Sequence, residues 1–162
     1  MTLLTGWRSG LLRTALSEAP EQEPWANLVS GSLHSGEDLA PLFEINTTDI
    51  NTVLKRYPMR INPYYLGLIK GPGDGLFEQA IPNPRELHGE NGFEDPLMEE
   101  DLSPVPGLTH KYPDRVLFLI SSRCAMYCRF CNRKRKVGRP SMVTEETIRE
   151  GLSYIRNNRK VR

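Results

Sequence analysis

The chain has 162 residues, of which 38% are hydrophobic and 25% are charged, and its formal net charge is +1. This length is sufficient for one ordinary domain with a hydrophobic core, and the composition is typical of a soluble globular protein. No apolar run approaches the roughly 18 residues that a membrane span requires, so we expect no membrane segment.

The first part of the chain predicts short helices separated by turns. A short helix is predicted over residues 10–16, and the polar stretch at residues 17–38 predicts a linker with turns. Residues 47–55 carry apolar side chains at helical spacing and predict a helix, for which Thr48 or Asp49 would be the N-cap.

A second short helix is predicted directly after Asn62, because Pro63 is favoured in the first turn of a helix. Its inward side chains are expected to be Tyr64, Tyr65, Leu68 and Ile69. Residues 71–114 contain many prolines and glycines, so we expect extended and irregular chain there, with residues 103–114 forming an arm outside the core.

Residues 116–120, "VLFLI", form a continuous apolar run of strand length and predict a strand buried on both faces. A long loop with the cysteines follows this strand. Thr144 then predicts a helix start, with an apolar stripe after it and acidic residues in the first turn. The order strand, loop, helix predicts one βα unit, and in parallel α/β folds functional sites lie at the carboxyl ends of the strands.

The chain has three cysteines, Cys124, Cys128 and Cys131, which all fall within eight residues in a C-x-x-x-C-x-x-C pattern. An odd number of clustered thiols argues against a secreted disulfide framework and favours a metal in a reducing compartment. We therefore expect a cytoplasmic protein. The alternative is an organellar transit peptide, since the first seventeen residues contain two arginines and no acid.

Three thiolates at this spacing fit a [4Fe–4S] cluster in which one iron has no protein ligand and stays open to a small molecule. A structural zinc would need a fourth, distant ligand, and no histidine has finger-like spacing from the cysteines (His34, His88, His110). Redox use of Cys128 and Cys131 as a dithiol pair would leave Cys124 without a role.

The small net charge conceals two segments of opposite sign. Residues 86–101 contain seven acids and no Lys or Arg, whereas residues 123–139 contain seven bases and no acid. Such runs are usually solvated faces, and the bases next to the cysteines could also pair with the acidic segment. Nucleic-acid binding is a competing explanation, but no aromatic residue lies within the run of four bases at residues 133–136 and no basic helix is predicted. We expect no nucleic-acid partner.

The cysteine motif lies within "DPLMEEDLSPVPGLTHKYPDRVLFLISSRCAMYCRFCNRKRKVG", residues 95–138. Nearly all of this stretch resembles the lysine 2,3-aminomutase family of radical S-adenosylmethionine (SAM) enzymes. The upstream stretches "MRINPYYLGLI" and "QAIPNPRELHGENGFEDPL" also resemble that family. The resemblance divides the chain into a variable segment (1–45), a helical and irregular region (46–107) and the start of a barrel domain with the cysteine loop (108–162).

The fold that the resemblance implies is α/β, with a helical and irregular N-terminal region before the first βα unit of a partial (β/α) barrel. The chain would then be the front part of a longer, truncated enzyme. In this family a [4Fe–4S] cluster cleaves SAM to a 5′-deoxyadenosyl radical, and the amino group of a substrate held on pyridoxal 5′-phosphate (PLP) moves to the neighbouring carbon.

The implied activity is that of an amino acid 2,3-aminomutase, an isomerase, with L-lysine as the favoured substrate. Glutamate and protein-bound lysine are the alternatives, and a non-catalytic metal-binding fragment is the rival from another class. The family's PLP lysine lies downstream of this region, so no catalytic residue is assigned and we expect the 162-residue chain alone to be inactive. The implied partners are a flavodoxin-like or ferredoxin-like one-electron reductant and further copies of the full-length chain.

The resemblance also implies roles for individual residues. The cluster ligands would be Cys124, Cys128 and Cys131, and Phe130 would lie against SAM unless it is only a packing residue. The positions near PLP are Lys111, Tyr112 and Arg115, with Arg115 as the phosphate ligand or, alternatively, part of an ordinary ion pair. The substrate α-carboxylate would be held by Arg133 through two parallel hydrogen bonds. Asn132 and Lys134 depart from the usual family residues, which leaves the substrate open.

Overall fold

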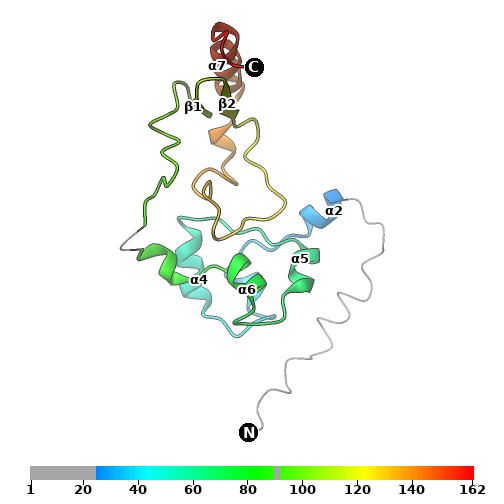
Figure 1. The fold of residues 1–162 in the computed structure, drawn as a ribbon. Helices are drawn as coiled ribbons and strands as arrows, with labels where there is room; N and C mark the ends of the chain where they lie inside the picture. The colour runs from blue at the N-terminus through cyan, green and yellow to red at the C-terminus, as the bar shows by residue number, and fades with distance from the viewer. Residues whose placement is uncertain (1–24, 90–91) are drawn as a thin grey trace, which may run out of the picture. The chain divides into compact units, whose positions relative to one another are not determined.

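A computed structural model describes residues 25–89 and 92–162 of the chain (Figure 1). The chain divides into two compact units. The helical unit consists of Met1–Glu86 and Ala125–Arg129, and the hairpin unit consists of Leu87–Cys124 and Phe130–Arg162. The middle of the cysteine loop therefore belongs to the helical unit, whereas its two flanks belong to the hairpin unit. The helix predicted over residues 10–16 lies outside the described residues.

The helical unit is built from short helices. They are α2 (Trp25–Ser30), α3 (Gly36–Leu39), α4 (Thr47–Leu54), α5 (Pro63–Leu68) and α6 (Gly75–Ala80), followed by the 3-10 helix η1 (Pro84–Leu87). Polar side chains cap the first turns of four of them, α3 to α6. The helix predicted over residues 47–55 is confirmed as α4, but its N-cap is Asn46, whose side chain accepts hydrogen bonds from Thr48 N and Asp49 N.

The core of the helical unit is apolar and draws on segments that are far apart in sequence. Its buried members are Leu39, Phe43, Ile50, Met59, Ile61, Ile69, Ala80 and Ile81. Within it the rings of Phe43 and Phe77 meet edge to face, with centroids 5.2 Å apart. The linker predicted over residues 17–38 is wrong for its described part, because α2 and α3 form there and α3 is held by a capping box between Ser35 and Asp38.

The helix predicted after Asn62 is confirmed as α5, and the Asn62 side chain accepts a hydrogen bond from Tyr65 N. The predicted inward face is only half right. Ile69 is buried and Tyr65 packs on the core, but Tyr64 is 67% exposed and Leu68 is 43% exposed. A helix of six residues is too short to bury a wide stripe, so two of its apolar side chains face solvent.

The hairpin unit contains two antiparallel strands, β1 (Leu108–Tyr112) and β2 (Arg115–Phe118). Leu108 pairs with Phe118 and Tyr112 pairs with Arg115, which joins the strands by a tight turn. The prediction of irregular chain over residues 71–114 is wrong at α6 and at β1, and Leu108 is fully buried. The predicted arm is thus partly a core strand.

The strand predicted over residues 116–120 is confirmed in part as β2, which covers residues 115–118. The prediction that both of its faces are buried is wrong, because its residues alternate between exposed and half-buried. The inward side faces α7 (Glu145–Asn157), where the Phe118 ring lies over Gly151. A Cβ added at Gly151 would come within 2.4 Å of that ring, so this close approach needs a glycine. Figure 1 shows β1 and β2 beside each other, with α7 next to them.

The helix predicted after Thr144 is confirmed as α7, with a capping box between Thr144 and Thr147. It follows the short 3-10 helix η2 (Pro140–Met142). Helices and a two-stranded antiparallel sheet make the fold mixed α/β, as expected. No helix in residues 25–89 and 92–162 has both the length and the apolar character that crossing a membrane would take.

Candidate metal centre and anion cavity

The three cysteines are free thiols; Cys124 is exposed, and Cys128 and Cys131 are half-buried. In the part of the chain that the structure describes, no group of three or more His, Cys, Asp or Glu side chains is arranged to hold a metal ion. The donor chemistry nevertheless fits an iron–sulfur cluster, since three unbridged thiols occur within eight residues.

Cys128 lies in a segment that backbone hydrogen bonds attach to the helical unit. Tyr127 N–H donates to the Arg60 carbonyl at 3.0 Å, and Arg129 N–H donates to the Gln79 carbonyl at 2.8 Å. The residues on both sides of Cys128 are therefore fixed through their main chain. At the start of the segment, Asn62 Nδ2 donates to the Ala125 carbonyl at 3.2 Å.

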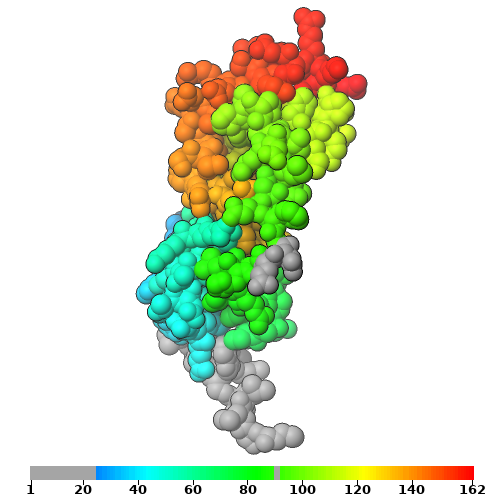
Figure 2. Space-filling view, turned by 90° about the vertical axis from the view of Figure 1, so that its left-hand side faces the viewer, coloured from blue at the N-terminus to red at the C-terminus, as the bar shows by residue number. Residues whose placement is uncertain are grey.

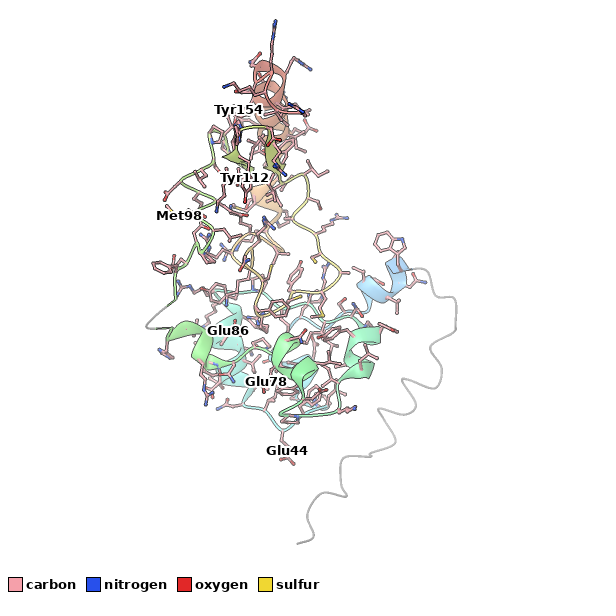
Figure 3. All side chains as sticks on the ribbon, viewed as in Figure 1. Glu44, Glu78, Glu86, Met98, Tyr112 and Tyr154 are labelled. Carbon is pink, nitrogen blue, oxygen red and sulfur yellow. The ribbon has the colours of Figure 1, made fainter. Side chains whose placement is uncertain are left out.

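Arg129, between the second and third cysteines, has a side chain that is 6% exposed. Its Nε and Nη2 donate to the two carboxylate oxygens of Glu86 at 3.0 and 2.8 Å, and its Nη1 donates to the Pro58 carbonyl at 2.9 Å. Figure 3 labels Glu86 in the helical unit. Of the two explanations for Arg129, solvated or paired with the acidic segment, pairing is confirmed, because Glu86 begins that segment.

The pKa of Tyr65, in the helical unit, depends on burial and on nearby charges. Burial raises the pKa of Tyr65, and the negative charges of Cys128 and Asp74 raise it further. Its hydroxyl donates to Gln79 Oε1 at 3.4 Å.

The hairpin unit contains a cavity of about 380 Å³. Its lining residues come from both strands, from the acidic segment and from the basic run: Leu97, Glu99, Thr109, Lys111, Tyr112, Arg115, Val116, Leu117 and Arg133. All four residues that the family resemblance placed near PLP or substrate lie on this one cavity. It holds three cationic side chains and one carboxylate, which makes it a candidate site for an anion.

Arg115 and Tyr112 face each other in the register of the hairpin. The Arg115 guanidinium lies over the Tyr112 ring, 5.2 Å from its centroid, and Arg115 Nε donates to Asp114 Oδ1 at 3.1 Å. The ordinary ion pair considered for Arg115 is thus present. Its members are 69% and 46% exposed, so the pair contributes little to stability.

Arg133 reaches the cavity from the basic run and is held by Glu99. Its Nη2 donates to Glu99 Oε1 at 2.5 Å, while Lys136 Nζ lies 3.5 Å from Glu99 Oε2. The Glu99 side chain is 7% exposed, and the buried Nε of Arg133 has no hydrogen-bond partner among the described residues. Glu99 thus fixes one side of the guanidinium and leaves a donor unused.

The acidic and basic segments meet in the hairpin unit at a second arginine. Arg135 donates to Glu100 Oε1 at 2.6 Å and lies 3.2 Å from Asp95 Oδ1. Burial raises the pKa of Asp95, but hydrogen bonds from the N–H groups of Glu100 and Glu99 and the charges of Arg135 and Lys136 outweigh it and hold the pKa below its usual value. Figure 2 shows the orange basic segment adjoining the green acidic one.

No individual signal in the sequence points to Glu86 and Glu99, which pair with Arg129 and Arg133. Both belong to the acidic segment, and only the opposite charge of the two runs pointed to a pairing. Phe130 is 68% exposed, so the packing role considered for it finds no support within its own unit.

No family model matches the chain. It is 48% identical over 124 residues to an L-lysine 2,3-aminomutase of Methanococcus maripaludis, covering 74% of this chain and 29% of that protein. It is 42% identical over 145 residues to an L-lysine 2,3-aminomutase of Clostridium subterminale, covering 85% of this chain and 35% of that protein. It is 32% identical over 150 residues to a glutamate 2,3-aminomutase of Clostridioides difficile, covering 87% and 36%.

The chain spans about a third of the length of these curated relatives. Five proteins named L-lysine 2,3-aminomutase, at identities from 34% to 48%, each match most of this chain. Over the matched residues the chain belongs to the lysine 2,3-aminomutase family.

Proposed function

We propose that this chain is part of a radical SAM, PLP-dependent amino acid 2,3-aminomutase whose substrate is L-lysine. The observation that carries the proposal is the cavity of about 380 Å³, on which Lys111, Tyr112, Arg115 and Arg133 meet. The names of the relatives at 34% to 48% identity support the reaction and the substrate. In the complete enzyme the hairpin unit would belong to the start of a partial (β/α) barrel.

Cys124, Cys128 and Cys131 would hold the iron–sulfur cluster, with one iron open to SAM. When bound, the cluster would supply the electron that cleaves SAM, and PLP would hold the substrate amino group. Phe130 directly precedes the third ligand and is exposed, so it is free to cover the bound SAM.

In the cavity, different cationic side chains would bind two different anions. Arg115, at the start of β2, would bind the PLP phosphate, and Lys111 and Tyr112 would line that end. Arg133 would hold the α-carboxylate of the substrate, because a planar guanidinium can give two parallel hydrogen bonds to a carboxylate. The unused Nε of Arg133 is one donor for that purpose. Fixing the carboxylate sets which hydrogen of the substrate faces the reacting group.

Glutamate is the second candidate substrate, because the Clostridioides difficile relative at 32% identity is named a glutamate 2,3-aminomutase. Arg133 would bind the α-carboxylate of lysine and of glutamate in the same way, because both substrates carry this group. The choice between them therefore depends on residues that contact the far end of the substrate.

The cellular setting that fits this chemistry is the cytoplasm, where three free thiols stay reduced. The electron would come from a flavodoxin-like or ferredoxin-like donor, and the full-length enzyme would be a homo-oligomer. The 162-residue chain alone would not convert lysine to β-lysine.

The cavity assignment is tested by PLP binding to the 162-residue chain, measured by equilibrium dialysis and absorbance. We expect saturable binding that Arg115→Ala weakens about tenfold, since a charged hydrogen bond to phosphate is lost. Arg85→Ala, which removes an exposed arginine of η1, is the control and should bind PLP like the unmodified chain. No saturable binding, or equal affinity of Arg115→Ala and the unmodified chain, would contradict the assignment.

A further inference from the structure

The segment Ala125–Arg129 of the cysteine loop is part of the helical unit rather than of the hairpin unit that contains the rest of the loop. Its attachment consists of main-chain and side-chain contacts to three separate stretches, namely residues 57–62, Gln79 and Glu86. Tyr127 is buried, and the Arg60 guanidinium lies 5.3 Å from the centroid of its ring. Cys128 is the cysteine inside this segment.

Arg129 connects these stretches through its side chain and its main-chain N–H. Two of its nitrogens bind the Glu86 carboxylate and a third binds the Pro58 carbonyl, while its own N–H binds the Gln79 carbonyl. The Arg129 and Glu86 side chains are only 6% and 12% exposed. Removing one partner of such a pair leaves a charge buried without compensation, which costs far more than the loss of an exposed pair.

We infer that the helical unit positions Cys128, and that Arg129 is a positioning residue that acts through its bidentate pair with Glu86. This inference rests on the proposed function for the role of Cys128 as a cluster ligand. The helical unit would thereby take part in binding the cluster, although it contains no cysteine other than Cys128.

The geometry requires arginine rather than lysine at position 129. A guanidinium presents several donors in one plane and can bind a carboxylate and a carbonyl simultaneously, whereas an ammonium is a single point of charge. Glu86 must likewise offer two oxygens in the plane of the fork. Aspartate keeps both oxygens and the charge, while glutamine loses the charge and one acceptor.

The attachment itself is tested by amide hydrogen exchange of the iron-free 162-residue chain. In Glu86→Gln the amides of Tyr127 and Arg129 should exchange at least about tenfold faster, because local opening of the segment becomes easier. The amides of α4, in the same unit, should keep their rates. Glu37→Gln is the matched control, because Glu37 is exposed and its carboxylate accepts a hydrogen bond from Asn51. Its exchange pattern should equal that of the unmodified chain.

The consequence for the metal is tested by iron and sulfide content after anaerobic reconstitution with limiting iron. Glu86→Gln and Arg129→Lys should each retain several-fold less iron than the unmodified chain and Glu37→Gln, and Glu86→Asp should restore part of the loss. Unchanged exchange at Tyr127 and Arg129 in Glu86→Gln, or an equal increase in α4, would overturn the inference. Iron retention by Glu86→Gln equal to the control would also overturn it. If the unmodified chain holds no cluster, the proposed function fails. The exchange result still decides whether the pair of Arg129 and Glu86 holds the segment of Cys128 on the helical unit.

Discussion

Glu99 is the single carboxylate on which two cations of the basic run converge, Arg133 at 2.5 Å and Lys136 at 3.5 Å. Because its side chain is 7% exposed, replacing it removes the compensation of both cations. We expect Glu99→Gln to lower the free energy of unfolding by about 1–3 kcal/mol, measured by urea denaturation. Glu100→Gln is the control, since Glu100 pairs with Arg135 but is 57% exposed, and it should cost less than about 1 kcal/mol. An equal cost of both variants would contradict the role given to Glu99.

At the scale of elements, α3 depends on a carboxylate whose ionisation is coupled to folding. The hydrogen bond from His34 N–H lowers the pKa of Asp38, burial opposes this, and hydrogen bonds from the N–H and hydroxyl of Ser35 lower the pKa further. A pKa lowered in the folded state adds stability above the unfolded value of about 3.9, and this stability disappears as the pH falls through the folded value. The stability difference between the unmodified chain and Asp38→Asn should therefore shrink as the pH is lowered from about 6 to about 3. A difference that stays constant over this range would contradict the coupling.

The packing of α7 on the hairpin depends on Gly151. An added Cβ would lie 2.4 Å from Phe118 Cε2 and 2.5 Å from its Cζ, so the ring or the helix has to move. Helix propensity favours alanine over glycine by about 1 kcal/mol, but overpacking typically costs about 1–3 kcal/mol. We expect Gly151→Ala to lower the thermal midpoint, whereas the exposed position of Ser153 lets Ser153→Ala leave it unchanged or raise it. A higher midpoint for Gly151→Ala would show that the close approach is not limiting.

The elements that the sequence predicted correctly are those specified by neighbouring residues. Asn62 with Pro63, and Thr144 with the acids after it, mark the starts of α5 and α7 by local capping. β1 was missed because "LTHKY" shows no apolar alternation, and its strand character comes from pairing with β2. In the site, the spacing of the cysteines was visible directly. Glu99 was not, since it contacts Arg133 across 34 positions of sequence that only the folded chain brings together.

At the scale of the whole molecule, this chain corresponds to about a third of the relatives it matches, yet it contains all three proposed cluster ligands and both arginines proposed to bind anions. Of the three cysteines, Cys128 belongs to the helical unit, whereas Cys124 and Cys131 belong to the hairpin unit. The central claim is therefore that the three thiolates hold a cluster with one iron left open.

The most direct test is electron paramagnetic resonance of the anaerobically reconstituted, dithionite-reduced 162-residue chain, with and without SAM. An open iron predicts a [4Fe–4S] signal whose shape changes when SAM is added, because SAM becomes a ligand of that iron. A signal that is indifferent to SAM would contradict the open site in this chain. A colourless protein that retains zinc and gives no cluster signal would contradict the cluster itself.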